Sequence, residues 1–205
     1  MVHARFFKLD SEKQKKIFEA AFAEFATHGF AEASLNRVIS NAEMSKGSVY
    51  YYFNGKEDLY EFVLRNTIEK LLVKSGPYPV PETEDTDEFW KVLEGYYLRT
   101  MQRLLESPQT SKLIRNWISG SDGPAVAKAG EQSVQETSSW FMKTILKGQR
   151  IGAIRNDLPA ELLITMAGGL GTSMDTWLVG HAFSVKDLET EVPRLFRVLR
   201  SAFSG

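Results

Sequence analysis

The chain has 205 residues, of which 43% are hydrophobic, so it can bury a sizeable core in one moderate domain or two small ones. Its formal net charge is −1. Residues 1–56 hold eight Lys and Arg against six Asp and Glu, a balance of +2, which excludes a protein that coats nucleic acid through a strongly basic surface.

The composition and the N-terminal sequence also indicate in which cellular compartment the protein is expected. No cysteine is present, which excludes disulfides and thiolate metal sites and fits a reducing compartment. The N-terminus shows no apolar signal region, and the longest weakly polar run, residues 162–174, is too short to span a membrane. We therefore expect a soluble, cytoplasmic protein with no membrane partner.

The first predicted helix runs from about Ser11 to Thr27, and Gly29 is placed as the C-cap that ends it. Its apolar face consists of Ile17, Ala20, Ala21, Phe25 and Phe30. A second short helix follows, with Ser34 at the N-cap position and an inner face of Leu35, Val38 and Ile39. A tight turn at residues 41–44 then leads into a third short helix, so the pair forms a helix-turn-helix.

The third helix, Ser45–Phe53, is the most informative part of the chain. At about 100° per residue, Val49 and Phe53 fall on one side and can be buried. The opposite side shows Lys46, Gly47, Tyr50 and Tyr51, with Tyr52 at the boundary. A helix this short is not stable alone in water, so its neighbours must brace it. Hydroxyls, a cation and a glycine suit close approach to DNA, although a tyrosine run in isolation is more often core or an exposed aromatic edge.

The rest of the chain also predicts helices. Lys56 opens a long helix to about Val73, and a loop rich in proline and acids follows at residues 75–87. Further helices are expected at about 88–106, 109–119, 125–150, 159–181 and 185–203. Ser184 and Asp187 form a capping pattern for the last helix, which Pro193 should kink or split. No strand and no internal repeat is predicted, so we expect an all-α fold.

Four ordered blocks carry a family resemblance. The runs Ile17–Phe30, Ser34–Ile39, Ser45–Phe53 and Lys56–Leu59 resemble the N-terminal DNA-binding region of the TetR family of bacterial transcriptional regulators, over roughly residues 12–64 without a gap. A weaker likeness lies at residues 152–158. The resemblance implies a three-helix DNA-binding domain at residues 1–55 and a helical effector-binding and dimerisation domain at residues 56–205.

The resemblance also assigns DNA-binding roles. The residues it marks are Ser34, Ser45, Lys46, Gly47, Ser48, Tyr50, Tyr51, Tyr52 and Lys56. Ser34 and Lys56 correspond to phosphate contacts, which fix position without reading sequence. Discrimination between bases would then depend on Lys46, which can contact a guanine, and on the tyrosine ring edges, which can contact thymine methyl groups. Ser34 can equally be an N-cap, and Lys56 alone would more often be a solvated charge.

Two positions depart from the family pattern. Glu43 stands in the turn where glycine is usual, so we expect the turn to tolerate a side chain at positive φ. Ile39 replaces a common alanine, which can alter how the two helices cross.

The helices after residue 56 carry an unusual load of large apolar side chains, which suits a pocket for a small molecule and is also typical of plain core. The candidate ligand-binding residues are Phe62, Trp90, Tyr97, Met101, Trp117, Trp140, Phe141 and Trp177. TetR regulators commonly bind effectors in this region. Isolated acids such as Glu94 and Asp175 are expected to face solvent, and the alternative is that they orient a ligand.

The last two predicted helices suggest a dimer surface. The first of these helices has small residues that permit close approach of a partner helix, and the second has an apolar stripe. The predicted interface residues are Ala167, Gly168, Gly171, Leu188, Leu195, Phe196 and Leu199. Packing this pair against its two-fold mate would form a four-helix interface.

Enzyme chemistry finds little support, because the three histidines are scattered and no thiol is present. We expect no metal and no cofactor. The expected function is a DNA-binding homodimer, a repressor by family precedent, released from a palindromic operator by a small apolar or aromatic effector. The alternatives are a helical ligand-binding protein or enzyme with a vestigial DNA-binding head, and an architectural DNA protein without an effector.

Overall fold

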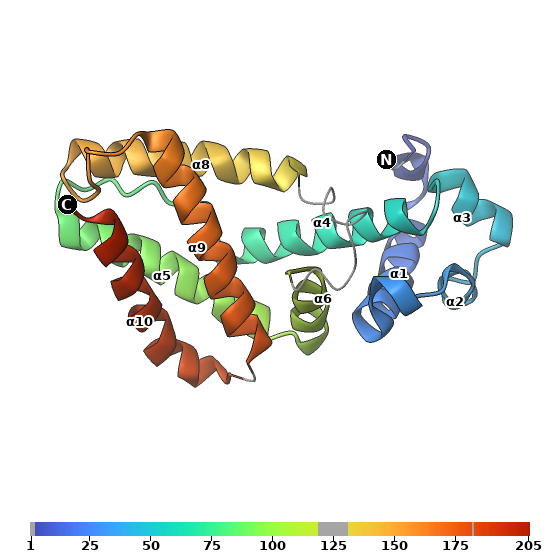
Figure 1. The fold of residues 1–205 in the computed structure, drawn as a ribbon. Coiled ribbons are helices and arrows are strands. Elements are labelled where there is room, and N and C mark those ends of the chain that lie inside the picture. Colours follow the sequence, from blue (N-terminus) through green and yellow to red (C-terminus); the bar gives the residue numbers. More distant parts are fainter. Residues whose placement is uncertain (1–2, 119–130, 182) are drawn as a thin grey trace. The chain divides into compact units, whose positions relative to one another are not determined.

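The computed structural model describes residues 3–118, 131–181 and 183–205, with the backbone alone for Lys46 and residues 131–138 (Figure 1). The described residues form helices and no strand, which confirms the predicted all-α fold. The chain divides into two compact units, and each is considered separately. Unit 1 is residues 1–70 with 108–131, and unit 2 is residues 71–107 with 132–205.

Unit 1 begins with a 3-10 turn, η1 (Phe6–Lys8), and the long helix α1 (Ser11–Glu32). The short helices α2 (Leu35–Asn41) and α3 (Lys46–Tyr52) follow, then α4 (Lys56–Ser75) as far as Lys70, and α6 (Pro108–Ile118). All of the helices predicted for this stretch are present within a few residues of their expected ends. Helix α1 packs against both α2 and α6, so it forms the centre of the unit.

Aromatic rings fill the core of unit 1 below α3. Phe6 and Phe53 are fully buried, and their ring centroids lie 5.1 Å apart. Phe62 of α4 contacts both rings, at 4.9 Å from Phe6 and 5.6 Å from Phe53. Because α4 also contributes the fully buried Leu59 and Val63, its first half is part of this core.

The division into units differs from the predicted boundary between residues 55 and 56. The reason is that the first half of α4 buries its apolar face against α1 and α3 rather than standing apart from them. Helix α6 joins unit 1 as well, where Lys112 Nζ donates to the carbonyl of Thr27 at 2.9 Å.

Two residues at positive φ shape the turns of unit 1. Gly29 has φ 69° and breaks the helical path of α1, which then makes a further short turn to Glu32. Glu43 has φ 54°, which confirms the expectation for the turn between α2 and α3. Its carboxylate pairs with Lys16 Nζ at 2.8 Å, so the side chain that replaces a glycine has a partner on α1.

Unit 2 contains α5 (Thr86–Leu105), α8 (Glu131–Arg150, from Gln132), α9 (Ala160–Gly180) and α10 (Val185–Phe203). Helix α10, red in Figure 1, packs along the green α5 and contacts α9. The Ser184–Asp187 capping box is confirmed at the start of α10. Pro193 lies inside α10 and does not split it.

The turn after α8 joins three helices of unit 2. The carbonyl of Gly148 accepts bonds from the amides of Ala153 and Ile154 at 2.8 and 3.1 Å, while Trp90 Nε1 of α5 donates to Ala153 O at 3.2 Å. The amide of Arg155 donates to Phe203 O of α10 at 2.8 Å. The short stretch with weaker family likeness, residues 152–158, therefore has a structural role.

None of the helices described in the structure combines the length and apolar character needed to cross a lipid bilayer.

Gly148 tests this junction, because a β-carbon there would lie 2.6 Å from Ile154 Cδ1 and 2.9 Å from Phe89 Cζ. We expect Gly148→Ala to lower the free energy of unfolding by about 1–3 kcal/mol through overpacking, measured by urea denaturation. Gly95→Ala on α5 is the matched control, because its β-carbon meets nothing closer than 3.7 Å and alanine favours a helix. Equal stability of the two variants would contradict this account.

Candidate functional site

The outer face of α3 is the first candidate site, and its arrangement confirms the predicted burial. Val49 is 1% exposed and points into the core, whereas Tyr50 and Tyr51 are 50% and 52% exposed. Tyr52 is half-buried at the boundary and its ring meets that of Tyr51 edge-on, with centroids 5.1 Å apart. Helix α3 therefore offers two tyrosine rings to a partner outside the protein.

The start of α3 is polar and open. The hydroxyls of Ser45 and Ser48 bond to each other at 2.6 Å, across the first turn. A β-carbon at Gly47 would meet no neighbouring group within 4 Å, and Gly47 has no positive φ. Nothing in the described part of the protein requires glycine there. Lys46 begins the helix, and its side chain lies outside the described part of the structure.

Ser34 occupies the N-cap position of α2, as predicted, but its hydroxyl makes no capping hydrogen bond. Its amide instead donates to Glu24 Oε1 at 2.8 Å. Lys56 is not a solvated charge: its ammonium group donates to the carbonyls of Ala31 and Ala33 at 3.0 and 3.3 Å and lies 4.6 Å from the centroid of the Phe30 ring. Lys56 thus ties the start of α4 to the connection between α1 and α2.

Sequence reasoning missed Glu24, a buried carboxylate on α1 that holds α2 in place. Arg37 of α2 donates to it through Nε at 2.9 Å and Nη2 at 2.5 Å, in addition to the Ser34 amide. Burial acts to raise the pKa of Glu24, but the bonds from Arg37 and Ser34 outweigh it and hold the pKa below its ordinary value. The only signal in the sequence was an acid on the apolar side of the first helix.

The candidate ligand-binding residues do not form one group. Trp140 and Phe141 of α8 lie 4.7 Å apart, and Tyr78, from the loop before α5, stacks on Trp140 at 5.1 Å. Tyr96 of α5 completes this group, 5.7 Å from Tyr78. We call these four side chains the aromatic cluster. Trp140 Nε1 donates to Pro79 O at 2.8 Å, which anchors the loop.

Two hydroxyl groups near the aromatic cluster have no hydrogen-bond partner among the described residues. They belong to Tyr96 of α5 and Thr144 of α8, which are 6% and 5% exposed. Thr144 lies one helical turn after Trp140 on α8. Burial raises the pKa of Tyr96 to about 12. Buried hydroxyls without partners are costly, so this region has unused capacity to bind a polar atom.

Tyr97 and Asp175 form a second group. The Tyr97 hydroxyl of α5 donates to Asp175 Oδ1 of α9 at 2.6 Å, and the Tyr97 ring contacts Phe196 at 5.5 Å. Burial raises the pKa of Asp175 to about 6, against the lowering effect of the Tyr97 bond, and burial also raises the pKa of Tyr97. The expectation that Asp175 faces solvent is therefore wrong. Its isolation in an otherwise uncharged stretch of helix was a usable signal.

The remaining candidates lie apart from these groups. Phe62 belongs to the core of unit 1, and Trp117 lies on α6 of the same unit. Met101 is buried on α5, and Trp177 of α9 is 37% exposed beside His181 and Phe183. Trp90 is buried on α5 and lines a surface pocket.

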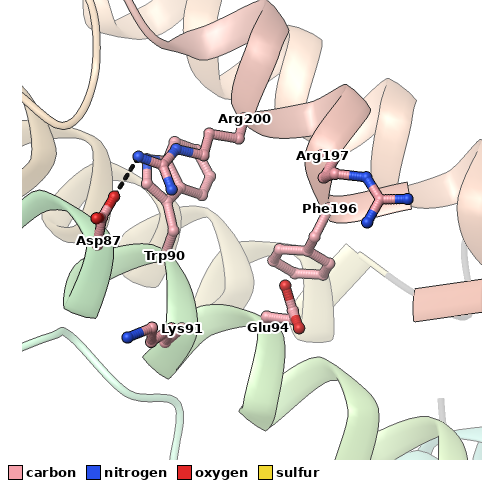
Figure 2. Close-up of a pocket in the computed structure, with 7 residues that line it drawn as sticks. All are labelled: Asp87, Trp90, Lys91, Glu94, Phe196, Arg197 and Arg200. Carbon is pink, nitrogen blue, oxygen red and sulfur yellow. Dashed lines mark hydrogen bonds and ion pairs between the residues drawn. The ribbon is translucent and has the colours of Figure 1, made fainter. Parts of the chain in front are cut away.

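That pocket, of about 230 Å³, lies between α5 and α10 (Figure 2). Its lining consists of Asp87, Trp90, Lys91, Glu94, Phe196, Arg197 and Arg200. Arg200 pairs with Asp87 at 2.5 Å. Because five of the seven lining residues carry charges, the pocket does not suit the apolar effector expected from the sequence.

The predicted dimer residues fall into two sets. Leu188 and Phe196 are 0% and 6% exposed because this side of α10 packs along α5, and Ala167 is also buried. Leu188 and Phe196 are thus core residues of the protomer. Gly168, Gly171, Leu195 and Leu199 are half-buried. The large apolar side chains that unit 2 exposes on α9 and α10 are Leu162, Trp177, Val185 and Val198.

Within the described ranges, no three His, Asp or Glu side chains come together as a metal site would require.

The raised pKa of Asp175 predicts a pH-dependent effect of Asp175→Asn. The folded state holds the carboxyl proton more tightly than the unfolded state, so this contribution to stability is present below pH 3.8 and is lost as the pH rises to about 6. At pH 7 we expect Asp175→Asn to raise the free energy of unfolding by up to about 3 kcal/mol, and at pH 3.5 to change it little.

Asp157→Asn is the matched control. Asp157 is exposed and pairs with Arg155, which holds the pKa of Asp157 below its ordinary value, so its effect has the opposite sign. Urea denaturation across pH measures both variants. A benefit of Asp175→Asn that does not change with pH would contradict the assigned cause.

Comparison with known proteins places this geometry in a family. The family model for bacterial regulatory proteins of the tetR family matches residues 17–63, which run from α1 into α4. The HTH-type transcriptional repressor SCO4008 of Streptomyces coelicolor is 31% identical over 163 residues, 77% of this chain and 78% of the relative.

Solved structures share the fold. A TetR-family transcription regulator from Shewanella sp. PV-4 has a TM-score of 0.72 at 18% identity, covering 94% of this chain and 98% of its own. FadR from Bacillus subtilis, in complex with stearoyl-CoA, has a TM-score of 0.69 at 16% identity, covering 91% and 97%. With its helix-turn-helix formed by α2 and α3, this chain belongs to the TetR family of bacterial transcriptional regulators and is a DNA-binding transcriptional regulator.

Proposed function

We propose that the protein is a homodimeric repressor that inserts α3 of each protomer into successive major grooves of a near-palindromic operator and leaves it when a small apolar or aromatic effector binds unit 2. The observation that carries this proposal is the outer face of α3. Two half-exposed tyrosines stand beside a glycine that the protein itself does not need. The printed name of the relative SCO4008 supports repression.

On DNA, the face of α3 provides few but varied contacts. Gly47 permits close approach of the helix backbone, while Lys46, Tyr50 and Tyr51 reach base edges or phosphates. Ser34, Ser45, Ser48 and Tyr52 supply further hydroxyls. Lys56 has three N–H groups and already gives two to carbonyls, so one remains for a phosphate.

The proposed dimer surface is the outer side of α9 and α10. Val198 is 64% exposed on α10, and Leu162 is 45% exposed on α9. A second protomer that covered these side chains would remove their apolar surface from water. A β-carbon at Gly168 or Gly171 would meet nothing within 4 Å, so α9 leaves room for close packing of a partner helix. Leu195 and Leu199 lie at the edge of this surface.

The proposed effector site is the aromatic cluster with the Tyr96 and Thr144 hydroxyls. Stacked rings favour a flat or apolar ligand, and the unpartnered hydroxyls favour one polar atom on it. The FadR complex with stearoyl-CoA is an example of a small molecule bound by this fold. Helix α4 contributes residues to both units, so it is the proposed lever between effector and DNA.

An effector releases DNA only if it binds the two states of the dimer with different affinity. The test is selection of bound fragments from random duplex DNA by the full chain, repeated with a metabolite library. We expect a near-palindromic site occupied by two protomers, and at least one compound that lowers its affinity. Failure to enrich any sequence would favour the alternative of a ligand-binding protein or enzyme with a vestigial DNA-binding head.

Gly47→Ala separates stability from DNA binding. Alanine favours a helix and meets no neighbour at this position, so the free energy of unfolding should rise by up to about 1 kcal/mol. The added methyl group stands between helix and DNA, so operator affinity should fall, measured by fluorescence anisotropy. Gly95→Ala is the control that gains stability without losing affinity. If Gly47→Ala bound the operator as tightly as wild type, Gly47 would not face DNA.

Tyr96→Phe tests the effector site before any effector is known. Removing a buried hydroxyl that has no partner in the described part of the chain should raise the free energy of unfolding of the unliganded protein by about 1–3 kcal/mol. The variant should bind the operator normally and respond less to the compound found above. Tyr97→Phe is the control, because the Tyr97 hydroxyl is bonded to Asp175 and its loss should not stabilise the protein.

A further inference from the structure

The segment His3–Phe6 lies against the C-terminal end of α3. Phe6 is fully buried and anchors the segment, with its ring 6.0 Å from that of Tyr52 and 5.1 Å from that of Phe53. From this anchor the backbone returns to α3, where the amide of His3 donates to Tyr52 O at 3.1 Å. The segment thus contacts the two last residues of α3 and the residue that follows it.

The imidazole of His3 has two close polar contacts at the same place. Its Nδ1 donates to Tyr51 O at 3.0 Å, and its Nε2 lies 2.8 Å from Asn54 Oδ1. The last four carbonyls of a helix have no partner within the helix. Phe53 N bonds to Val49 O, so His3 satisfies two of the remaining carbonyls of α3, those of Tyr51 and Tyr52.

Arg5 fixes the side chain of Tyr51 from the same segment. The guanidinium carbon lies 4.1 Å from the centroid of the Tyr51 ring, a stacked cation–π contact. The Tyr52 ring also contacts the Tyr51 ring, in an edge-on arrangement. Tyr51 is therefore held at its backbone carbonyl by His3 and at its ring by Arg5.

We propose that His3 and Arg5 are positioning residues for DNA recognition, which hold the last turn of α3 and the Tyr51 ring in the orientation that the operator requires. The proposal rests on the proposed function of α3. A helix of seven residues has few internal hydrogen bonds, so loss of the imidazole bond to Tyr51 O frays a large share of it. The residue that frays is Tyr51, which is half-exposed on the DNA-facing side.

A pair of amide variants isolates the bond to Tyr51 O. In His3→Asn the Nδ2 group occupies the place of Nδ1 and keeps this bond, whereas in His3→Gln the Nε2 group replaces the ring Nε2 and faces Asn54. We expect His3→Gln and His3→Ala to weaken operator binding by about tenfold, and His3→Asn to retain most of it. Hydrogen exchange of a peptide spanning residues 46–54 should be faster in the first two variants and near wild type in the third.

The salt dependence of binding separates positioning from direct contact with DNA. Loss of a phosphate contact lowers the slope of log K against log salt by about 0.9, whereas a positioning residue leaves it unchanged. We expect Arg5→Ala and Arg5→Lys both to weaken binding by about threefold with an unchanged slope, because lysine cannot stack its charge in the same way. Lys8→Ala is the matched control, since it removes an exposed charge from the adjoining turn η1 and should change affinity little.

The outcomes are distinguishable from failure of the proposed function. If wild type binds the selected operator and all His3 variants bind it equally, the positioning proposal is wrong and the regulator stands. A reduced salt slope in Arg5→Ala with rescue by Arg5→Lys would also overturn it. If wild type selects no DNA, the proposed function fails instead. Circular dichroism of each variant checks the fold, and the Asn–Gln comparison keeps the test valid should His3→Ala unfold.

Discussion

Bracing of a seven-residue helix is the constraint on which unit 1 depends. Helix α3 cannot persist in water alone, because so short a helix gains too few hydrogen bonds to offset the entropy lost in forming it. Val49 and Phe53 anchor it from below, in a core where the rings of Phe6, Phe53 and Phe62 touch one another. The same burial that stabilises α3 turns Tyr50 and Tyr51 outward. The exposed face of α3 is thus a consequence of the hydrophobic packing beneath it.

Polar contacts then fix what the apolar core leaves free. Glu24 accepts hydrogen bonds from Arg37 and from the Ser34 amide, and these bonds fix the start of α2. Lys56 donates to the carbonyls of Ala31 and Ala33, which lie just before α2. Both are charged side chains used inside the protein, in a unit whose N-terminal 56 residues carry only +2. A regulator built this way relies on shape and on a small number of oriented groups more than on a broad positive field. This suits recognition of one discrete site.

In unit 2 the same helices form the core, the proposed effector site and the outer surface. One side of α10 buries Leu188, Val192 and Phe196 against α5, while the opposite side exposes Val198. Between α5 and α8 the Tyr96 and Thr144 hydroxyls have no hydrogen-bond partner among the described residues, and between α5 and α9 Tyr97 holds a carboxyl group whose pKa is raised by burial. These polar groups are unfavourable for the stability of the protein alone, which is the usual mark of positions that serve binding.

Periodicity and cap residues in the sequence by themselves determined the all-α fold, the approximate helix ends and the outward face of α3, because each depends on residues close together in the chain. The positive φ of Glu43 was expected from the family resemblance, which places glycine at that turn position. Tertiary structure alone decided which apolar stripes face inward. The sequence predicted Leu188 and Phe196 as part of a dimer surface and Phe62 as a ligand-binding residue. In the structure, Leu188 and Phe196 are buried on the side of α10 that packs along α5, and Phe62 contacts Phe6 in the core of unit 1. The tertiary structure alone also revealed Glu24 with Arg37, Tyr97 with Asp175, and His3 at the end of α3. Those pairs are 13, 78 and 48 residues apart, and no local pattern encodes which distant side chain will complete a buried charge or an open carbonyl.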